Sequence, residues 1–402
     1  MIKKIVFFSF SPIVKKLHYK RFGVEILKEN GFEVWIYDFS PIVFPSIHNA
    51  VIHRIEKIIS DEYFLFYDEK KAIQAIHELG EDCFVVVTGY YQLETFKIYR
   101  ALSKTNIPYA AWQTSVEPNG LPNLLNDIGQ SGEPLLWKLF LRFKCFNLKN
   151  LKKLLYKPKL APILGIRAPD MCILSGEKSL ELNGVAALVG NKTELIWSHA
   201  HDYDTYLDDL QKKEAEENIA VFIEPPGPMH PWDELVDDNA LWTIEEYYPS
   251  HCRFFDYVEQ ELKLKVVIAA HPKTNHTDYP EYFGKRHVIR NQLLPLIKKS
   301  KLVMTHNSTA LVLVAVERKP VLILTNVAFE KDISCSRGLK VTAAAFGKTS
   351  IDVDQLPYSI DWQRELLVNE RLYSSYVQQY VKKADSEKLN SWQILANRLK
   401  QS

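Results

Sequence analysis

Short, continuous apolar runs alternate with amphipathic helical patterns along most of the chain, and this alternation constrains the fold more than any other feature. Strands of a parallel sheet are buried on both faces, so they read as uninterrupted apolar runs separated by the helices that cover the sheet. A helix is expected from about Val14 to Asn30. In the first half we expect strands at Ile5–Phe10, Phe32–Tyr37, Cys83–Val87, Tyr109–Trp112 and Asp170–Leu174.

The second half repeats the scheme, with strands expected at Asn218–Ile223, Lys265–Ala269, Leu302–Met304 and Val321–Leu324. The 402 residues are enough for two domains. We therefore expect an α/β protein with one open parallel sheet in residues 1–200 and a second in residues 201–402. The tail from about Trp362 to Lys400 has no Pro or Gly and is expected to be helical. Ligands of such sheets bind beyond the carboxyl ends of the strands.

The net charge of +1 hides an uneven distribution. Residues 134–169 contain nine Lys or Arg and no Asp or Glu, so the rest of the chain carries −8. Aromatic, aliphatic and basic residues alternate there at helical spacing, which is typical of a helix lying on an anionic membrane. The alternative is an ordinary surface helix whose lysines lie over the core. Nucleic acid is not an expected partner, because no recognised binding module accompanies the charge.

The cysteines and the amino terminus indicate the compartment. Five scattered cysteines without a CxxC pair fit a reducing environment better than a disulfide framework. The stretch MIKKIVFFSFSPIVKK lacks the features of a signal peptide, and no apolar run reaches the roughly 18 residues of a spanning helix. We expect a cytoplasmic protein, with peripheral contact with the inner face of the membrane under the first interpretation of the basic segment.

Two strand ends in the second half carry the most informative side chains. Lys265–Ala269 leads into His271-Pro272-Lys273. Leu302–Met304 leads into Asn307-Ser308-Thr309 and a helix expected over Ala310–Glu317. Hydroxyls and free N–H groups at a helix start bind phosphate, and an imidazole at a neighbouring strand end can bind the same anion. Each segment alone is more often a helix cap or a turn; their order along the chain favours a shared anion site.

On these motifs the chain resembles bacterial glycosyltransferases of capsule and lipopolysaccharide synthesis. Those enzymes have a GT-B fold, carry an HP and an S motif, and use CMP-activated sialic-acid-like or Kdo-like sugars. His271-Pro272 matches the HP motif, and Ser308-Thr309, within THNSTALVLVAVERKPVLIL, matches the S motif. The resemblance covers about Lys265–Leu324. It implies two Rossmann-like domains facing a central cleft, with the imidazole and the two hydroxyls holding the phosphate of the CMP donor.

One departure from the family concerns the ribose. Related enzymes often place a ribose-binding carboxylate on the helix after the S motif, but no acidic residue lies between Ser308 and Val316. Glu317 is the remaining candidate on that helix, and its alternative role is that of a surface helix residue.

The resemblance implies glycosyl transfer from a CMP-activated acidic sugar to a glycan or lipid-linked acceptor, with no metal and no further cofactor. Direct displacement by an acceptor hydroxyl needs a general base. Glu117 is the first candidate, ahead of Glu224 and Asp38. Two alternatives remain: a CDP-alcohol phosphotransferase of teichoic-acid type, and a non-catalytic nucleotide-sugar-binding subunit of a polysaccharide assembly complex.

The segment Ser198–Asp204 contains His199, His201 and Asp202, a plausible ligand set for zinc. It departs from the HxHxDH pattern of metallohydrolases, because Tyr203 and Asp204 stand where Asp and His are required. We therefore expect an interdomain hinge leading into a helix rather than a metal site.

Overall fold

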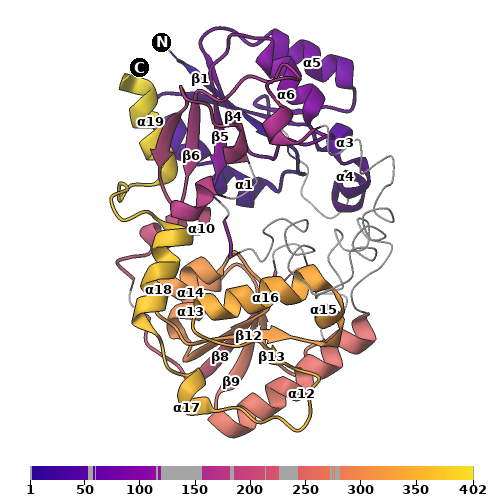
Figure 1. Cartoon of the computed structure of the whole chain (residues 1–402), viewed down its shortest axis with the longest axis vertical. Coiled ribbons are helices and arrows are strands. Elements are labelled where there is room, and N and C mark those ends of the chain that lie inside the picture. The colour runs from indigo at the N-terminus through magenta and orange to yellow at the C-terminus, as the bar shows by residue number, and fades with distance from the viewer. Residues whose placement is uncertain are drawn as a thin grey trace, which may run out of the picture. The chain divides into compact units, whose positions relative to one another are not determined.

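The computed structural model of this chain describes residues 2–52, 58, 60–114, 116–118, 156–181, 185–212, 214–225, 243–271, 274, 276 and 281–401. Its contacts divide the chain into two compact units. Unit 1 comprises Met1–Val116, Asn123–His201 and Lys382–Ser402, and unit 2 comprises Glu117–Pro122 and Asp202–Val381. Each unit is built on a parallel sheet flanked by helices (Figure 1).

The sheet of unit 1 has seven strands in the order β3-β2-β1-β4-β5-β6-β7, all paired in parallel. The five expected strands all form, with ends within one residue of those predicted. Its two faces are covered by separate apolar clusters. The strands are β1 (Lys4–Ser9), β2 (Glu33–Asp38), β3 (Tyr63–Leu65), β4 (Cys83–Val87), β5 (Tyr109–Gln113), β6 (Met171–Leu174) and β7 (Glu194–Trp197).

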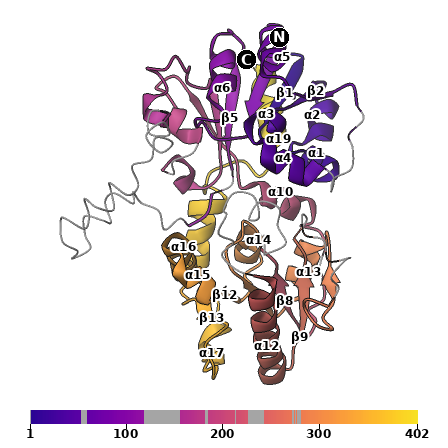
Figure 2. The ribbon, with the colours of Figure 1, turned by 90° about the vertical axis from the view of Figure 1, so that its right-hand side faces the viewer.

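The helices of unit 1 connect and cover these strands, and α5 and α6 pack side by side (Figures 1 and 2). They are α1 (Lys15–Arg21), α2 (Val24–Glu29), α3 (Ser40–Val43), α4 (Pro45–Ile52), α5 (Glu69–His77), α6 (Phe96–Ser103) and the carboxy-terminal α19 (Ser391–Gln401). Short 3₁₀ segments lie at Pro158–Leu160, Glu177–Leu180 and Val185–Leu188.

The single helix predicted from Val14 to Asn30 is wrong, because the structure breaks it into α1 and α2 at Gly23. Gly23 has a φ of 53°, which favours glycine. A Cβ atom there would lie 2.1 Å from Cδ1 of Trp392 in α19. The indole of Trp392 is buried and its Nε1–H donates to the carbonyl of Arg21 at 2.7 Å. A residue near the end of the chain therefore decides where the first helix stops.

The sheet of unit 2 has six strands in the order β10-β9-β8-β11-β12-β13, again all parallel. The four expected strands lie at its centre. The strands are β8 (Ile219–Ile223), β9 (Lys265–Ala269), β10 (Val288–Ile289), β11 (Leu302–Thr305), β12 (Val321–Thr325) and β13 (Ile351–Asp352). With two such sheets and their helices, the fold is GT-B-like, and the expected fold class is confirmed.

Helices α15 and α16 of unit 2 pack on each other, and α16 packs on β12 (Figure 2). The tail predicted as helical is interrupted, since α17, α18 and α19 are separate and a π-helical segment, Val377–Val381, follows α18. The helices are α10 (His201–Asp208), α12 (Ile244–Leu262), α13 (Leu293–Lys299), α14 (Leu311–Val316), α15 (Val327–Lys331), α16 (Ile333–Ala345), α17 (Trp362–Glu365) and α18 (Glu370–Tyr376).

The chain passes from unit 1 to unit 2 between His201 and Asp202, one residue after the predicted boundary. It returns at Lys382, so residues 382–402 belong to unit 1. The return is fixed inside unit 1 by hydrogen bonds from Ser198 Oγ to Ser391 Oγ at 2.8 Å and between His199 Nε2 and the Leu389 carbonyl at 2.9 Å.

Helix α12, the longest of the described helices, begins with a capping box that gives a first testable prediction. The Thr243 hydroxyl accepts from the Glu246 N–H at 3.2 Å, and the Glu246 carboxylate accepts from the Thr243 N–H at 3.5 Å. Replacing Thr243 with alanine removes one of these bonds and should lower the free energy of unfolding by about 1 kcal/mol. Thr243→Ser keeps the hydroxyl and should unfold at the wild-type urea concentration. Equal urea midpoints for the alanine variant and the wild type would contradict the cap.

Candidate functional site

The carboxyl ends of β9, β8 and β11 lie side by side at one edge of the unit 2 sheet, and the three strands end at the same level in the register. Ile223 pairs with Ala269, and Phe222 pairs with Met304, so Thr305 lies beside Ile223. The Thr305 hydroxyl donates to the Ile223 carbonyl at 3.0 Å. His271 and Asn307 each lie two residues beyond this level. With β8 between them, the ends of β9 and β11 are separated by about 10 Å, two spacings of about 4.8 Å.

Glu224 follows the middle strand and organises the loop after β9. Its side chain is fully buried. One carboxylate oxygen accepts from the His271 N–H at 2.9 Å and the Thr274 hydroxyl at 2.8 Å, and the other accepts from His276 Nε2–H at 2.8 Å. The carboxylate thus holds three donors of the His271–His276 segment. Its geometry is that of a group that positions His271, since a general base that takes the proton from an acceptor hydroxyl needs an accessible oxygen.

Asn307, Ser308 and Thr309 form the turn between β11 and α14. Asn307 and Thr309 are exposed and Ser308 is half-buried. Ser308 Oγ accepts from the Ala310 N–H at 3.2 Å, and its carbonyl accepts from the Leu311 N–H at 3.0 Å. The helix that follows has six residues, shorter than the expected Ala310–Glu317. Any anion at this turn is therefore bound by local hydroxyl, amide and N–H groups rather than by the dipole of a long helix.

Glu117 belongs to unit 2 by its contacts and lies beside the same turn. The Asn307 side-chain amide donates to the Glu117 carboxylate at 2.9 Å. Burial raises the pKa of Glu117, and the nearby Asp202 adds to the increase. The structure therefore brings together the first candidate base and the candidate phosphate turn, a neighbourhood that no local sequence pattern contains.

Glu317, the candidate ribose ligand, is not brought to this edge. It follows the last residue of α14, at the opposite end of that helix from Ser308. One of its carboxylate oxygens, Oε1, lies 3.9 Å from Nζ of Lys298 on α13. Helix α14 runs back along the sheet, so its end lies towards the amino ends of the strands. Pro272 and Lys273 lie outside the described residues, so their predicted roles stay predictions.

A buried pair of histidines lies directly behind the turn, and the sequence analysis missed it. His306 Nε2 lies 2.8 Å from Nε2 of His251, which α12 contributes. Both rings are buried, and burial lowers the pKa of His251 to about 4 and that of His306 well below its usual value. The position of His306 after a buried strand was the only available signal, because His251 is 55 residues away in the sequence.

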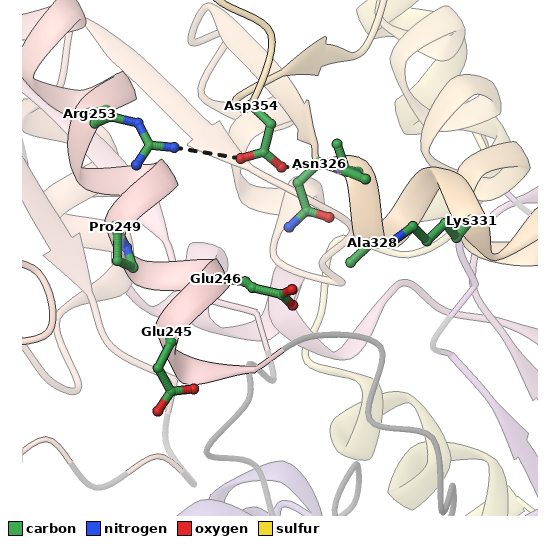
Figure 3. Close-up of a pocket in the computed structure, with 9 residues that line it drawn as sticks. Glu245, Glu246, Pro249, Arg253, Asn326, Ala328, Lys331 and Asp354 are labelled. Carbon is green, nitrogen blue, oxygen red and sulfur yellow. Dashed lines mark hydrogen bonds and ion pairs between the residues drawn. The ribbon is translucent and has the colours of Figure 1, made fainter.

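A polar pocket of about 280 Å³ lies beyond the carboxyl ends of β12 and β13 (Figure 3). The Asn326 side chain, which is buried, caps α15 by accepting from the Phe329 N–H at 2.9 Å. Arg253 faces Asp354 at 3.9 Å across the pocket. The remaining wall is formed by Glu245, Glu246, Pro249, Val327, Ala328 and Lys331. Side chains of both charge signs and an amide thus line a space at the carboxyl edge of the same sheet.

In unit 1, Asp38 is fully buried at the end of β2. It accepts from the N–H groups of Ile13 and Ser40 at 3.3 and 2.8 Å and from the Tyr63 hydroxyl at 2.9 Å. These bonds give it a structural role. His199 is likewise held by the Leu389 carbonyl. In the part of the chain that the structure describes, no group of three or more His, Cys, Asp or Glu side chains is arranged to hold a metal ion.

None of the helices in the described ranges is long and apolar enough to cross a membrane. Most of the basic segment 134–169 lies outside those ranges; residues 156–169 are described and include only the 3₁₀ turn Pro158–Leu160. Its predicted contact with a membrane stays a prediction.

No protein-family model and no curated protein matches the chain. Solved structures do. The structure of the wall teichoic acid polymerase TagF with CDPG aligns over 99% of this chain and 88% of its own, with 12% identity and a TM-score of 0.52. S. aureus MnaA with UDP aligns over 99% and 96%, with 14% identity and a TM-score of 0.48. Acinetobacter baumannii MurG aligns over 100% of both chains, with 10% identity and a TM-score of 0.46. At 12% identity, the similarity with TagF concerns the fold.

Proposed function

We propose that the chain is a glycosyltransferase that binds a nucleotide-activated sugar at the carboxyl edge of the unit 2 sheet. The observation that carries the proposal is that β9 and β11 end at the same level on either side of β8, so that His271 and the Asn307–Thr309 turn both follow one edge of the sheet. An anion between the two strand ends can be met by the imidazole from one side and by hydroxyls and N–H groups from the other. The donor we propose is a CMP-activated acidic sugar, as the HP and S motifs suggest.

The proposed chemistry needs two kinds of group. His271, Ser308 and Thr309 stabilise the negative charge that develops on the departing phosphate. Glu117 takes the proton of the acceptor hydroxyl, and burial, which raises its pKa, makes its carboxylate a stronger base. Asn307 orients the Glu117 carboxylate, and Glu224 holds the backbone from which His271 extends. Within this proposal no step requires a metal or other cofactor.

The acceptor we propose is a glycan or a lipid-linked glycan of the bacterial surface. A cytoplasmic location, with the basic segment in contact with the inner face of the membrane, would bring the enzyme to such an acceptor. Vesicle co-sedimentation with anionic and with neutral lipid would separate this role of the segment from that of an ordinary surface helix.

The nucleotide is tested by thermal unfolding with CMP, CDP, UDP and GDP. A ligand that binds only the folded protein stabilises it by about 2.7 kcal/mol at one hundred times its Kd. We expect CMP to raise the melting temperature, because the proposed site is complementary to the leaving group. A shift with UDP alone would overturn the cytidine assignment.

Two other functions are distinguished by related outcomes. A CDP-alcohol phosphotransferase would turn over CDP-glycerol and no CMP-sugar. A non-catalytic nucleotide-sugar-binding subunit would show the nucleotide-dependent shift, yet product formation in cells would be unchanged by His271→Ala.

A further inference from the structure

The two buried histidines behind the phosphate turn form a chain of three polar contacts, and each end of the chain is a backbone carbonyl. His251 Nδ1 lies 2.6 Å from the Tyr247 carbonyl, and His306 Nδ1 lies 2.8 Å from the Leu324 carbonyl. The two Nε2 atoms face each other at 2.8 Å. A carbonyl can only accept, so each Nδ1 must carry a hydrogen if both outer contacts are hydrogen bonds.

The number of protons does not match the number of contacts. Two neutral imidazoles carry two N–H hydrogens, whereas the chain has three contacts, each of which needs one. In the neutral pair one contact therefore always joins two acceptors. A third proton satisfies all three contacts and gives the pair one positive charge. Burial opposes that charge, which keeps the free pair neutral at pH 7.

The surroundings favour a cation once burial is offset. Aromatic rings pack on the pair from three elements: Phe222 of β8, Tyr247 of α12, whose ring centroid lies 4.0 Å from that of His251, and Phe329 of α15, 4.6 Å from that of His306. Ring faces attract cations. Among the described residues, the Asp354 carboxylate after β13 favours the charged form of His251, and the Arg253 guanidinium lies 3.9 Å from that carboxylate. Burial raises the pKa of the Tyr247 hydroxyl, and the charge of the Glu224 carboxylate raises it further.

We propose that His251 and His306 are positioning residues for the donor phosphate, and that the pair takes up one proton when a phosphate anion occupies the Asn307–Thr309 turn. This inference rests on the proposed function. His306 is joined directly to Asn307, so an anion at the turn lies close enough to favour the charged pair. Protonation in turn completes the hydrogen bonds that hold His306. Because His306 precedes Asn307, these bonds also fix the start of the turn. Binding and protonation therefore strengthen each other by the same factor.

The sign of the pH dependence follows from this coupling. The anion raises the pKa of the pair above its lowered value in the free protein. Affinity should increase as the pH falls through the pKa of the bound form and should level off below the pKa of the free form. Between these two pKa values, the affinity should rise almost tenfold for each unit by which the pH falls. This rise comes in addition to any change caused by the titration of the phosphate itself.

Calorimetry at pH 7 in two buffers of different ionisation enthalpy counts the protons taken up on binding CMP. Wild type should take up about one proton more than His306→Gln, and the subtraction cancels protonation of CMP. His251→Gln provides a second variant if the first fails to fold. His287→Gln, an exposed histidine in the same unit, should match wild type. If the wild type and a folded His306→Gln or His251→Gln variant took up the same number of protons on binding CMP, the inference would be overturned and the proposed function would stand.

A complementary measurement uses ¹⁵N-histidine NMR of the wild-type protein with inorganic phosphate. Ring nitrogens with and without a hydrogen have distinct shifts, so the extra proton is seen directly. If CMP fails to bind but phosphate adds a proton to the pair, the nucleotide assignment is wrong and this inference holds. Phosphate binding without a new ring N–H, or no phosphate binding at all, would overturn it.

Discussion

Replacing His271 with alanine should reduce donor turnover by about 10²–10³-fold without disturbing the fold, because a preorganised group aimed at developing charge contributes that much. The His271 backbone is held by its N–H, which donates to Glu224 at 2.9 Å, and by its carbonyl, which accepts from the Thr274 hydroxyl at 2.9 Å. The substitution keeps those bonds and removes the imidazole alone. Release of CMP from a CMP-sugar, together with the melting temperature, measures both consequences.

The matched control is His287→Ala. His287 is an exposed histidine just before β10 on the same sheet, so the change in charge and residue type is the same. Its turnover should equal that of the wild type. A His271→Ala enzyme with unchanged turnover would remove His271 from the site, whereas a large fall in its melting temperature would show that the imidazole stabilises the loop.

Replacing Glu224 with alanine should cost about 3–5 kcal/mol of stability, because it leaves the buried His276 imidazole, the buried Thr274 hydroxyl and the half-buried His271 N–H without their common acceptor. For unit 2, whose main segment is Asp202–Val381, such a loss lowers the melting temperature by on the order of 10 °C. Differential scanning calorimetry, which resolves the transitions of separate units, measures it.

Glu224→Gln separates positioning from charge. The glutamine oxygen still accepts hydrogen bonds, but its NH₂ group cannot accept from His276, so an intermediate loss of stability is expected. Glu281→Ala, on the exposed surface of the same unit, should be neutral. If Glu224→Ala melted at the wild-type temperature while losing all turnover, the carboxylate would act in catalysis rather than in holding the His271 loop.

The sequence was sufficient for the interior of both sheets and insufficient at their edges. The strands that were missed, β3, β7, β10 and β13, are the four edge strands. Each has two to four residues and lies partly exposed, so it lacks the continuous apolar run that marks a strand buried on both faces. Edge strands form because a central strand offers them unpaired backbone groups, and this information lies elsewhere in the chain.

The same limit applies to the candidate site. His271 and Asn307–Thr309 were predictable, since each follows a buried strand and parallel strands end at a common edge. The buried role of Glu224 was not, because it depends on Thr274 and His276 folding back over the strand end. Neither the Glu117–Asn307 contact nor the His251–His306 pair has a local pattern, since each joins residues separated by 190 and 55 positions.

The most direct test of the central claim is a donor screen with the purified protein, in which release of the nucleotide is followed with CMP-sialic acid, CMP-Kdo, CDP-glycerol and UDP-GlcNAc. We expect CMP release from a CMP-sugar, increased by a glycan acceptor and reduced about 10²–10³-fold by His271→Ala. Turnover of CDP-glycerol or UDP-GlcNAc with no turnover of either CMP-sugar would contradict the proposed function.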